Sequence, residues 1–206
     1  MKNPKFIPEP STSYSAGVAY IIFPKKELAQ SKAEGLVPRI ILILQKAGEK
    51  NLLKGGRFFI ERRNWKMPMG HFDPKIDSDL IDTAIREFKE EAGLEVKRSQ
   101  LSMKRSAILR IRSDRPGQEF HEDRFFLVIS DEEPKKAEKA ELDEVIELVQ
   151  EFPLDTLPLD NSPASGATLA MGQRRKLAVL LLECQKDLSV AGLTLDSLKK
   201  VLFSLR

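Results

Sequence analysis

Three glutamates, Glu87, Glu90 and Glu91, stand three and four residues apart in a stretch with the pattern of a helix. Side chains at these spacings project from one side of a helix, so the three carboxylates come close together. Their mutual repulsion calls for a neutralising cation, and hard divalent cations prefer oxygen ligands. The alternative interpretation is a solvated acidic face on an ordinary amphipathic helix, which the three glutamates alone do not exclude.

The helix that carries these glutamates has boundaries in the sequence. Asp77 or Ser78 is expected to cap its start, because a short side-chain oxygen accepts an unpaired backbone N–H. Gly93 is expected to end it, because glycine tolerates the left-handed conformation found there. Apolar residues recur at helical spacing beside the glutamates, at Ile81, Ala84, Ile85, Phe88 and Ala92. The pattern predicts a helix that buries this apolar stripe and presents the carboxylates next to it.

Two neighbouring stretches resemble the Nudix box. Residues 86–94, Arg-Glu-Phe-Lys-Glu-Glu-Ala-Gly-Leu, match all seven specified positions of its second half. Residues 65–71, Trp-Lys-Met-Pro-Met-Gly-His, resemble the usual lead-in to the box. The chain therefore resembles the Nudix hydrolase family, over approximately residues 14–190 and most specifically over residues 65–94.

The first half of the box departs from the family pattern. That pattern runs from a glycine through five residues to a glutamate, and through seven more to Arg-Glu. The distance from Gly70 to Arg86 is two residues longer here. The glutamate position falls on Ile76 or Ser78, depending on the end from which it is counted. In the family this glutamate mainly orients the box arginine, so Asp77 or Asp79 is the expected replacement.

The resemblance implies hydrolysis of a pyrophosphate linkage in a nucleoside diphosphate joined to another group. It implies Mg²⁺ or Mn²⁺ as the cofactor, held by Glu87, Glu90, Glu91 and the backbone carbonyl of Gly70. Such an ion withdraws charge from the phosphates and lowers the pKa of a bound water. Arg86 is expected to fix the carboxylates, since its guanidinium fork matches carboxylate geometry. The expected catalytic residues are Arg86, Glu90 and Glu91.

A general base and the phosphate-binding residues are less closely defined by the sequence. The resemblance implies a glutamate on a loop after the box, and the candidates are Glu132, Glu133, Glu141 and Glu144, with Glu119 and Glu122 also open. His121 stands beside them, and a structural or surface role is the interpretation for it. Basic residues that could contact phosphate are Arg57, Arg62, Arg63, Lys66, Arg110 and Arg112.

The substrate stays open among a nucleoside triphosphate, a nucleotide sugar, ADP-ribose and a capped or triphosphorylated RNA end. The net charge is only +3, and the sequence contains no long basic run. Both observations argue against nucleic acid as the partner. A small nucleotide is therefore the expected partner. A second hypothesis is a Nudix-fold module that binds a nucleotide without turnover; the missing first glutamate supports it, and the intact carboxylates argue against it.

Composition sets the expected fold class and location. The 206 residues are 41% hydrophobic and 32% charged, as in soluble globular proteins, and they contain no apolar run of membrane-spanning length. The single cysteine, Cys184, excludes an internal disulfide and predicts a buried thiol in a cytoplasmic protein. The resemblance implies an α/β fold in which a mixed β-sheet sandwich lies between helices, an α/β/α arrangement.

The chain is expected to divide into a flexible arm (residues 1–13), the Nudix domain (14–190) and a C-terminal helix (191–206). That helix is expected to pack on the domain, with a homodimer contact as the alternative. Strands are predicted over 16–23, 39–45, 106–112 and 120–129, the last two forming a hairpin, and helices over 169–188 and 193–205. Trp65 is predicted to pack in the core rather than to stack on a base.

Overall fold

A computed structural model describes residues 8–23, 37–46, 51–53, 57–59, 63–113, 117–138, 146–159 and 167–205. Its strands are β1 (Thr12–Ile22), β2 (Arg39–Gln45), β3 (Asn51–Leu53), β4 (Arg57–Phe59), β5 (Asn64–Lys66), β6 (Met69–His71), β7 (Ser106–Arg112), β8 (Phe120–Ser130), β9 (Ile146–Pro153) and β10 (Thr168–Leu169). Its helices are α2 (Leu80–Ala92), α3 (Met171–Glu183), α4 (Gln185–Val190) and α5 (Leu195–Ser204). None of these described helices has the length and hydropathy needed to span a bilayer.

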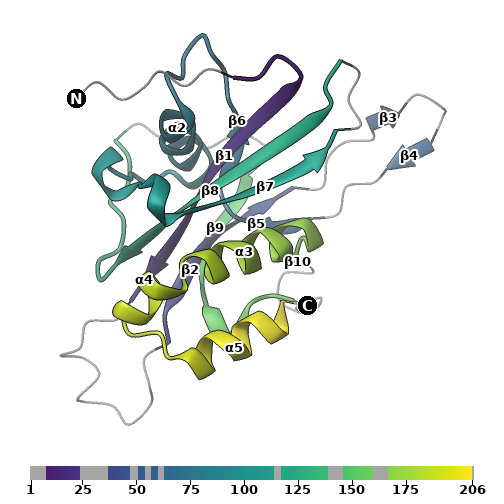
Figure 1. The fold of residues 1–206 in the computed structure, drawn as a ribbon. Helices are drawn as coiled ribbons and strands as arrows, with labels where there is room; N and C mark the ends of the chain where they lie inside the picture. Colours follow the sequence, from purple (N-terminus) through teal and green to yellow (C-terminus); the bar gives the residue numbers. More distant parts are fainter. Residues whose placement is uncertain are drawn as a thin grey trace.

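One mixed sheet forms the centre of the molecule (Figure 1). Its strands run in the order β10-β5-β2-β1-β8-β7, with β6 also pairing with β1 and β9 with β2. The predicted hairpin is confirmed, because β7 pairs antiparallel with β8 from Ser106 to Arg112. β1 pairs parallel with β8 over its whole length, an arrangement that places Ser13 opposite His121 and Ser15 opposite Asp123.

Helices cover both faces of this sheet, which confirms the predicted α/β/α class. Successive residues of β1 and β2 alternate between two apolar clusters, as side chains of a strand covered on both faces must. Phe88 of α2 packs in one cluster, and Leu177 of α3 and Leu198 of α5 pack in the other. Figure 1 shows α2 on one side of the sheet and α3, α4 and α5 on the opposite side.

Several predicted elements have different boundaries in the structure. β1 already begins at Thr12, inside the residues predicted as an arm, because Thr12 and Ser13 pair with the start of β8. The helix predicted over 169–188 is two helices that meet at Cys184. Apolar spacing continues through both, so periodicity could not show the break. Cys184 is buried as predicted, and burial raises the pKa of its thiol to about 11.

The lead-in to the box, residues 65–71, is held in place by contacts with other elements of the fold. Trp65 is 1% exposed and meets the ring of Phe152 edge to face, which confirms that it packs in the core. Gly17 of β1 lies directly beneath the lead-in, where an added Cβ would come within 2.5 Å of the Pro68 carbonyl oxygen. Gln173 of α3 accepts a hydrogen bond from the N–H of Met67 at 3.3 Å. The backbone entering the box is thus set by three separate elements of the fold.

Candidate active site

The N-cap of α2 lies one residue after the nearest predicted cap, Ser78. Asp79 is the N-cap, and its carboxylate accepts the N–H groups of Ile81 and Asp82 at 2.9 and 3.0 Å. The prediction that Asp77 or Ser78 caps the helix is therefore wrong. Gly93 ends the helix with φ 65°, as predicted. The cap moves to Asp79 because the carboxylate of Asp77 is engaged by side chains of the helix itself.

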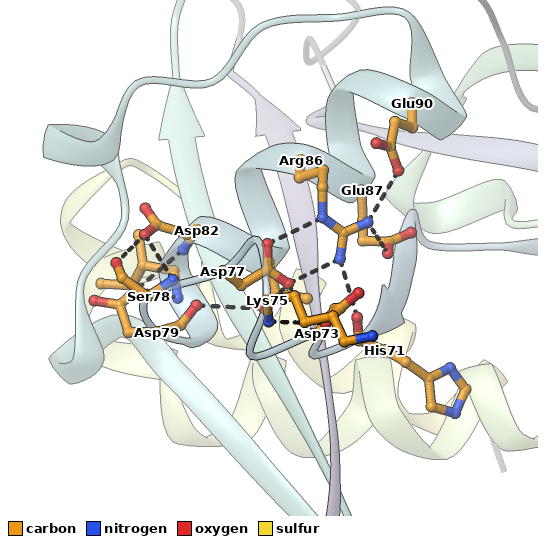
Figure 2. Close-up of polar contacts among 12 residues, drawn as sticks. His71, Asp73, Lys75, Asp77, Ser78, Asp79, Asp82, Arg86, Glu87 and Glu90 are labelled. Atoms are coloured by element: carbon orange, nitrogen blue, oxygen red, sulfur yellow. Dashed lines mark hydrogen bonds and ion pairs between the residues drawn. The ribbon is translucent and has the colours of Figure 1, made fainter. Parts of the chain in front are cut away.

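Asp77 holds Arg86 with a two-pronged ion pair (Figure 2). Its Oδ1 accepts from Nε of Arg86 at 3.0 Å, and its Oδ2 accepts from Nη2 at 2.9 Å. Oδ2 also accepts from Oγ1 of Thr83 at 3.0 Å and from the N–H of Asp73 at 3.1 Å. Burial opposes ionisation of Asp77, but these bonds outweigh it and hold its pKa below the ordinary value.

This ion pair accounts for the lengthened spacing. Six residues separate Gly70 from Asp77 and eight separate Asp77 from Arg86, so each half of the interval has gained one residue. Residues 74–76 form a turn that closes with a hydrogen bond from the Asp77 N–H to the Asp73 carbonyl at 2.8 Å. Asp77 therefore stands where the family glutamate would orient the arginine, whereas Asp79 caps the helix and pairs with Arg98.

The remaining donors of Arg86 reach two box glutamates and the backbone. Nη1 donates to Oε1 of Glu87 at 2.6 Å and to Oε2 of Glu90 at 3.0 Å. Nη2 donates to the carbonyl of His71 at 3.0 Å. The hydrogen bond with Asp77 raises the pKa of the guanidinium further above its ordinary value, and Glu87 adds to this effect. Arg86 thus ties the start of the box to the carboxylates of its helix.

The carboxylate of Glu87 lies where a side chain at position 70 would be. A Cβ added to Gly70 would lie 2.1 Å from the carboxylate carbon of Glu87. The absence of a side chain at position 70 therefore allows the carboxylate to lie against the backbone. Burial raises the pKa of Glu87, the charge of Glu90 adds to the rise, and Arg86 opposes it.

Replacing Gly70 by alanine is expected to remove activity while sparing the fold. The three atoms nearest to the new methyl group all belong to the carboxylate of Glu87, the end of a flexible side chain, so Glu87 must move its carboxylate away. We expect kcat to fall about 100-fold, as when a preorganised electrostatic group is lost, with a small change in Tm. Steady-state assays and thermal unfolding measure the two effects. The control is Gly172→Ala in α3, where an added Cβ meets nothing within 4 Å. Full activity in Gly70→Ala would contradict the placement of Glu87.

Glu91 is the most deeply buried of the three box glutamates. Its Oε1 accepts from Nζ of Lys66 at 2.7 Å, and its Oε2 accepts from the N–H of Met69 at 2.7 Å. Burial raises the pKa of Glu91, and the ammonium of Lys66 opposes that rise. Glu91 therefore joins the box helix to β5 through one oxygen and to β6 through the other.

A cavity of about 710 Å³ lies between the box, the end of β7 and the start of β8. The predicted site residues that the structure brings to its wall are Lys66, Gly70, Arg86, Glu87, Glu91 and Arg112. Glu90 is exposed and pairs with Arg86, and it is not among the described residues that line the cavity. The three carboxylates therefore share one side of α2, but only two of them face the cavity.

The other predicted residues lie elsewhere or outside the described residues. Arg110 pairs with Glu9 at 2.9 Å and lies over the ring of Phe120, and Arg63 pairs with Glu147. Glu132 and Glu133 follow the C-terminal end of β8 and line hollows other than this cavity. Glu119 is exposed, and Glu122 lies 3.7 Å from Arg124. Arg62, Glu141, Glu144 and the side chain of Arg57 lie outside the described residues.

Two cavity residues that the sequence did not identify, Asp123 and Lys176, form a connected group with His121. Asp123 is buried; its Oδ2 lies 2.9 Å from Nζ of Lys176, and its Oδ1 lies 2.9 Å from Nε2 of His121. Nδ1 of His121 lies 2.6 Å from Oγ of Ser13. Both ring nitrogens of His121 are thus engaged, which fits a structural role. Asp123 stands between Glu122 and Arg124 at the start of β8, so its sequence context contains no signal that sets it apart.

The carboxylates of the box have the right chemistry for a hard divalent cation. Among the residues that the structure describes, no three His, Cys, Asp or Glu side chains are grouped to hold a metal ion as they stand. The box carboxylates have other partners: Lys66 and Met69 donate to Glu91, and Arg86 donates to Glu87. The close fit of the Glu87 carboxylate against Gly70 nevertheless brings a backbone segment and a carboxylate together, as the expected ligand set requires.

Comparisons with known proteins give the family and the fold of the chain. The NUDIX domain model matches residues 36–170. A MutT/nudix family protein from Enterococcus faecalis has 16% identity, with the match covering 100% of this chain and 76% of that chain at a TM-score of 0.55. The NUDIX domain of Shewanella oneidensis NrtR, complexed with ADP ribose, has 12% identity over 85% and 87% at a TM-score of 0.50. No curated protein matches the sequence.

The family match spans more than half of the chain, and the two structures share its fold at identities that indicate fold alone. The chain belongs to the NUDIX domain family, which confirms the resemblance of its box. It is accordingly a hydrolase of the class that acts on phosphoric anhydrides.

Proposed function

We propose that this protein hydrolyses the pyrophosphate linkage of a small nucleoside diphosphate derivative and depends on Mg²⁺ or Mn²⁺. The observation that carries this proposal is the convergence of Gly70, Glu87 and Glu91 on one cavity. Arg86 lines the same cavity and is held in position by Asp77. A cavity of about 710 Å³ is within the usual range for small-molecule sites.

The charges around the cavity support the need for added cations. Its described lining holds four basic side chains and four carboxylates: Lys66, Arg86, Arg112, Lys176, Asp73, Glu87, Glu91 and Asp123. These charges balance, and most of the basic groups are already paired with a carboxylate. A diphosphate adds several negative charges, so its binding is favoured when divalent cations accompany it.

The residues of the chain divide the work by position. Glu87, Glu91 and the carbonyl of Gly70 would hold the metal, with Glu90 beside them. Once bound, the metal would polarise the phosphates and activate a water molecule. Arg86 keeps Glu87 in one orientation, and Asp77 keeps Arg86 in place. Arg112 and Lys176 lie on the cavity wall and are the proposed phosphate contacts.

A substrate panel tests the proposed reaction. The purified protein is incubated with a nucleoside triphosphate, a nucleotide sugar, ADP-ribose and a dinucleoside polyphosphate, with Mg²⁺, Mn²⁺ or EDTA. We expect release of a mononucleotide or phosphate from at least one compound with metal and none with EDTA. Binding of a nucleotide without turnover in either metal would contradict the proposal and favour the binding module. Turnover that persists in EDTA would contradict the metal dependence.

A further inference from the structure

The Lys66–Glu91 pair lies inside the cavity rather than at its rim. Lys66 reaches from β5 to α2, and its Nζ lies 2.7 Å from Oε1 of Glu91. The lysine side chain is 15% exposed and the glutamate side chain 7%. A cation therefore already occupies an oxygen that the proposed function requires for a metal ion.

The two oxygens of Glu91 are not equally exchangeable. Oε2 accepts the N–H of Met69, which belongs to a strand fixed by its pairing with β1. Oε1 is held by the end of a flexible lysine side chain, which can leave without moving the backbone. A divalent cation that approaches from the cavity therefore competes with Lys66 for Oε1, because two positive charges at one carboxylate oxygen repel each other.

We propose that Lys66 is an exchangeable counter-ion of the metal site, an inference that rests on the proposed function. It pairs with the buried Glu91 and orients its carboxylate, and it yields Oε1 to the divalent cation. The displaced ammonium remains in the cavity lining, where the nearest new anion is a phosphate group of the substrate. Metal binding thus converts Lys66 from a partner of Glu91 into a phosphate contact.

Mn²⁺ titration by calorimetry tests this exchange without relying on activity. The variants are Lys66→Met, which removes the charge, and Lys66→Gln, which keeps a hydrogen-bond donor. The matched control is Lys89→Met, since Lys89 is an exposed lysine on the helix that carries Glu91. We expect both Lys66 variants to bind Mn²⁺ about tenfold more tightly than wild type, and Lys89→Met to match wild type.

Thermal unfolding with and without Mn²⁺ gives a second readout, valid wherever the variant folds. Lys66→Met is expected to have a lower Tm than wild type without Mn²⁺ and a larger rise in Tm when Mn²⁺ is added. Unchanged or weaker Mn²⁺ binding by both Lys66 variants, with binding by wild type, would overturn the role of Lys66 and leave the metal site standing. Equal Mn²⁺ binding by wild type and Glu91→Gln would overturn the metal site itself, and the inference with it.

Discussion

Glu91→Gln is expected to lower kcat by about 100- to 1000-fold, the cost typical of losing one preorganised electrostatic group. Glutamine keeps an oxygen for the N–H of Met69 but loses the charge that is proposed to hold the metal. It also leaves Lys66 without its carboxylate, so we expect a loss of about 1–3 kcal/mol in the free energy of unfolding. Steady-state kinetics with the best compound of the panel measures the first effect, and denaturant unfolding measures the second.

The control for this substitution is Glu95→Gln, an exposed glutamate just beyond the box helix. It should leave both kcat and stability near the wild-type values. Glu90→Gln provides an internal comparison, because Glu90 is exposed and does not line the cavity. We expect Glu90→Gln to lower kcat less than Glu91→Gln does. Equal turnover by wild type and Glu91→Gln would show that the assigned carboxylate is not part of the reaction.

Asp77→Asn should lower both activity and stability, because its side chain both orients Arg86 and accepts the N–H of Asp73 across the turn before the helix. Removing the charge leaves a largely buried arginine with weaker partners. We expect a loss of about 2–3 kcal/mol in the free energy of unfolding. Loss of this outer support is expected to lower kcat about 10- to 100-fold. Urea unfolding and kinetics on the same preparation separate the two effects.

The pH dependence of this variant distinguishes a charge effect from a packing effect. The pKa of Asp77 lies below its ordinary value of 3.8 in the folded protein, so its contribution to stability is present above that pH. It is lost as the pH falls through the lowered pKa. The stability gap between wild type and Asp77→Asn should therefore be constant near neutral pH and narrow below 3.8.

Asp82→Asn is the matched control, because Asp82 lies in the first turn of α2 and pairs with Arg98 at the surface. Exposed pairs contribute little, so its stability should change by less than about 1 kcal/mol. A gap for Asp77→Asn that is as small as that of Asp82→Asn would contradict the structural role of the Asp77–Arg86 pair.

The box helix, its end at Gly93 and its buried apolar stripe were all predictable from the order of residues alone. These are local properties, since helical spacing and the conformational freedom of glycine act within a few residues. The same local pattern correctly predicted the β7–β8 hairpin, whose strands are joined by a short segment with Pro116 and Gly117 as its turn signal. The match of residues 86–94 to the Nudix box made Arg86 and the glutamates the candidate site residues.

The sequence could not show which aspartate holds Arg86 or which side chains meet across the cavity, because these contacts form only when distant segments pack together. Asp77 and Asp79 are chemically identical in the sequence, and the path of the turn before α2 directs one to the arginine and the other to the helix end. Lys66 meets Glu91 because two sequence-distant elements pack together, and Asp123 meets Lys176 for the same reason. Such contacts depend on parallel pairing of β1 with β8 and on packing of helices against the sheet, which no local spacing encodes.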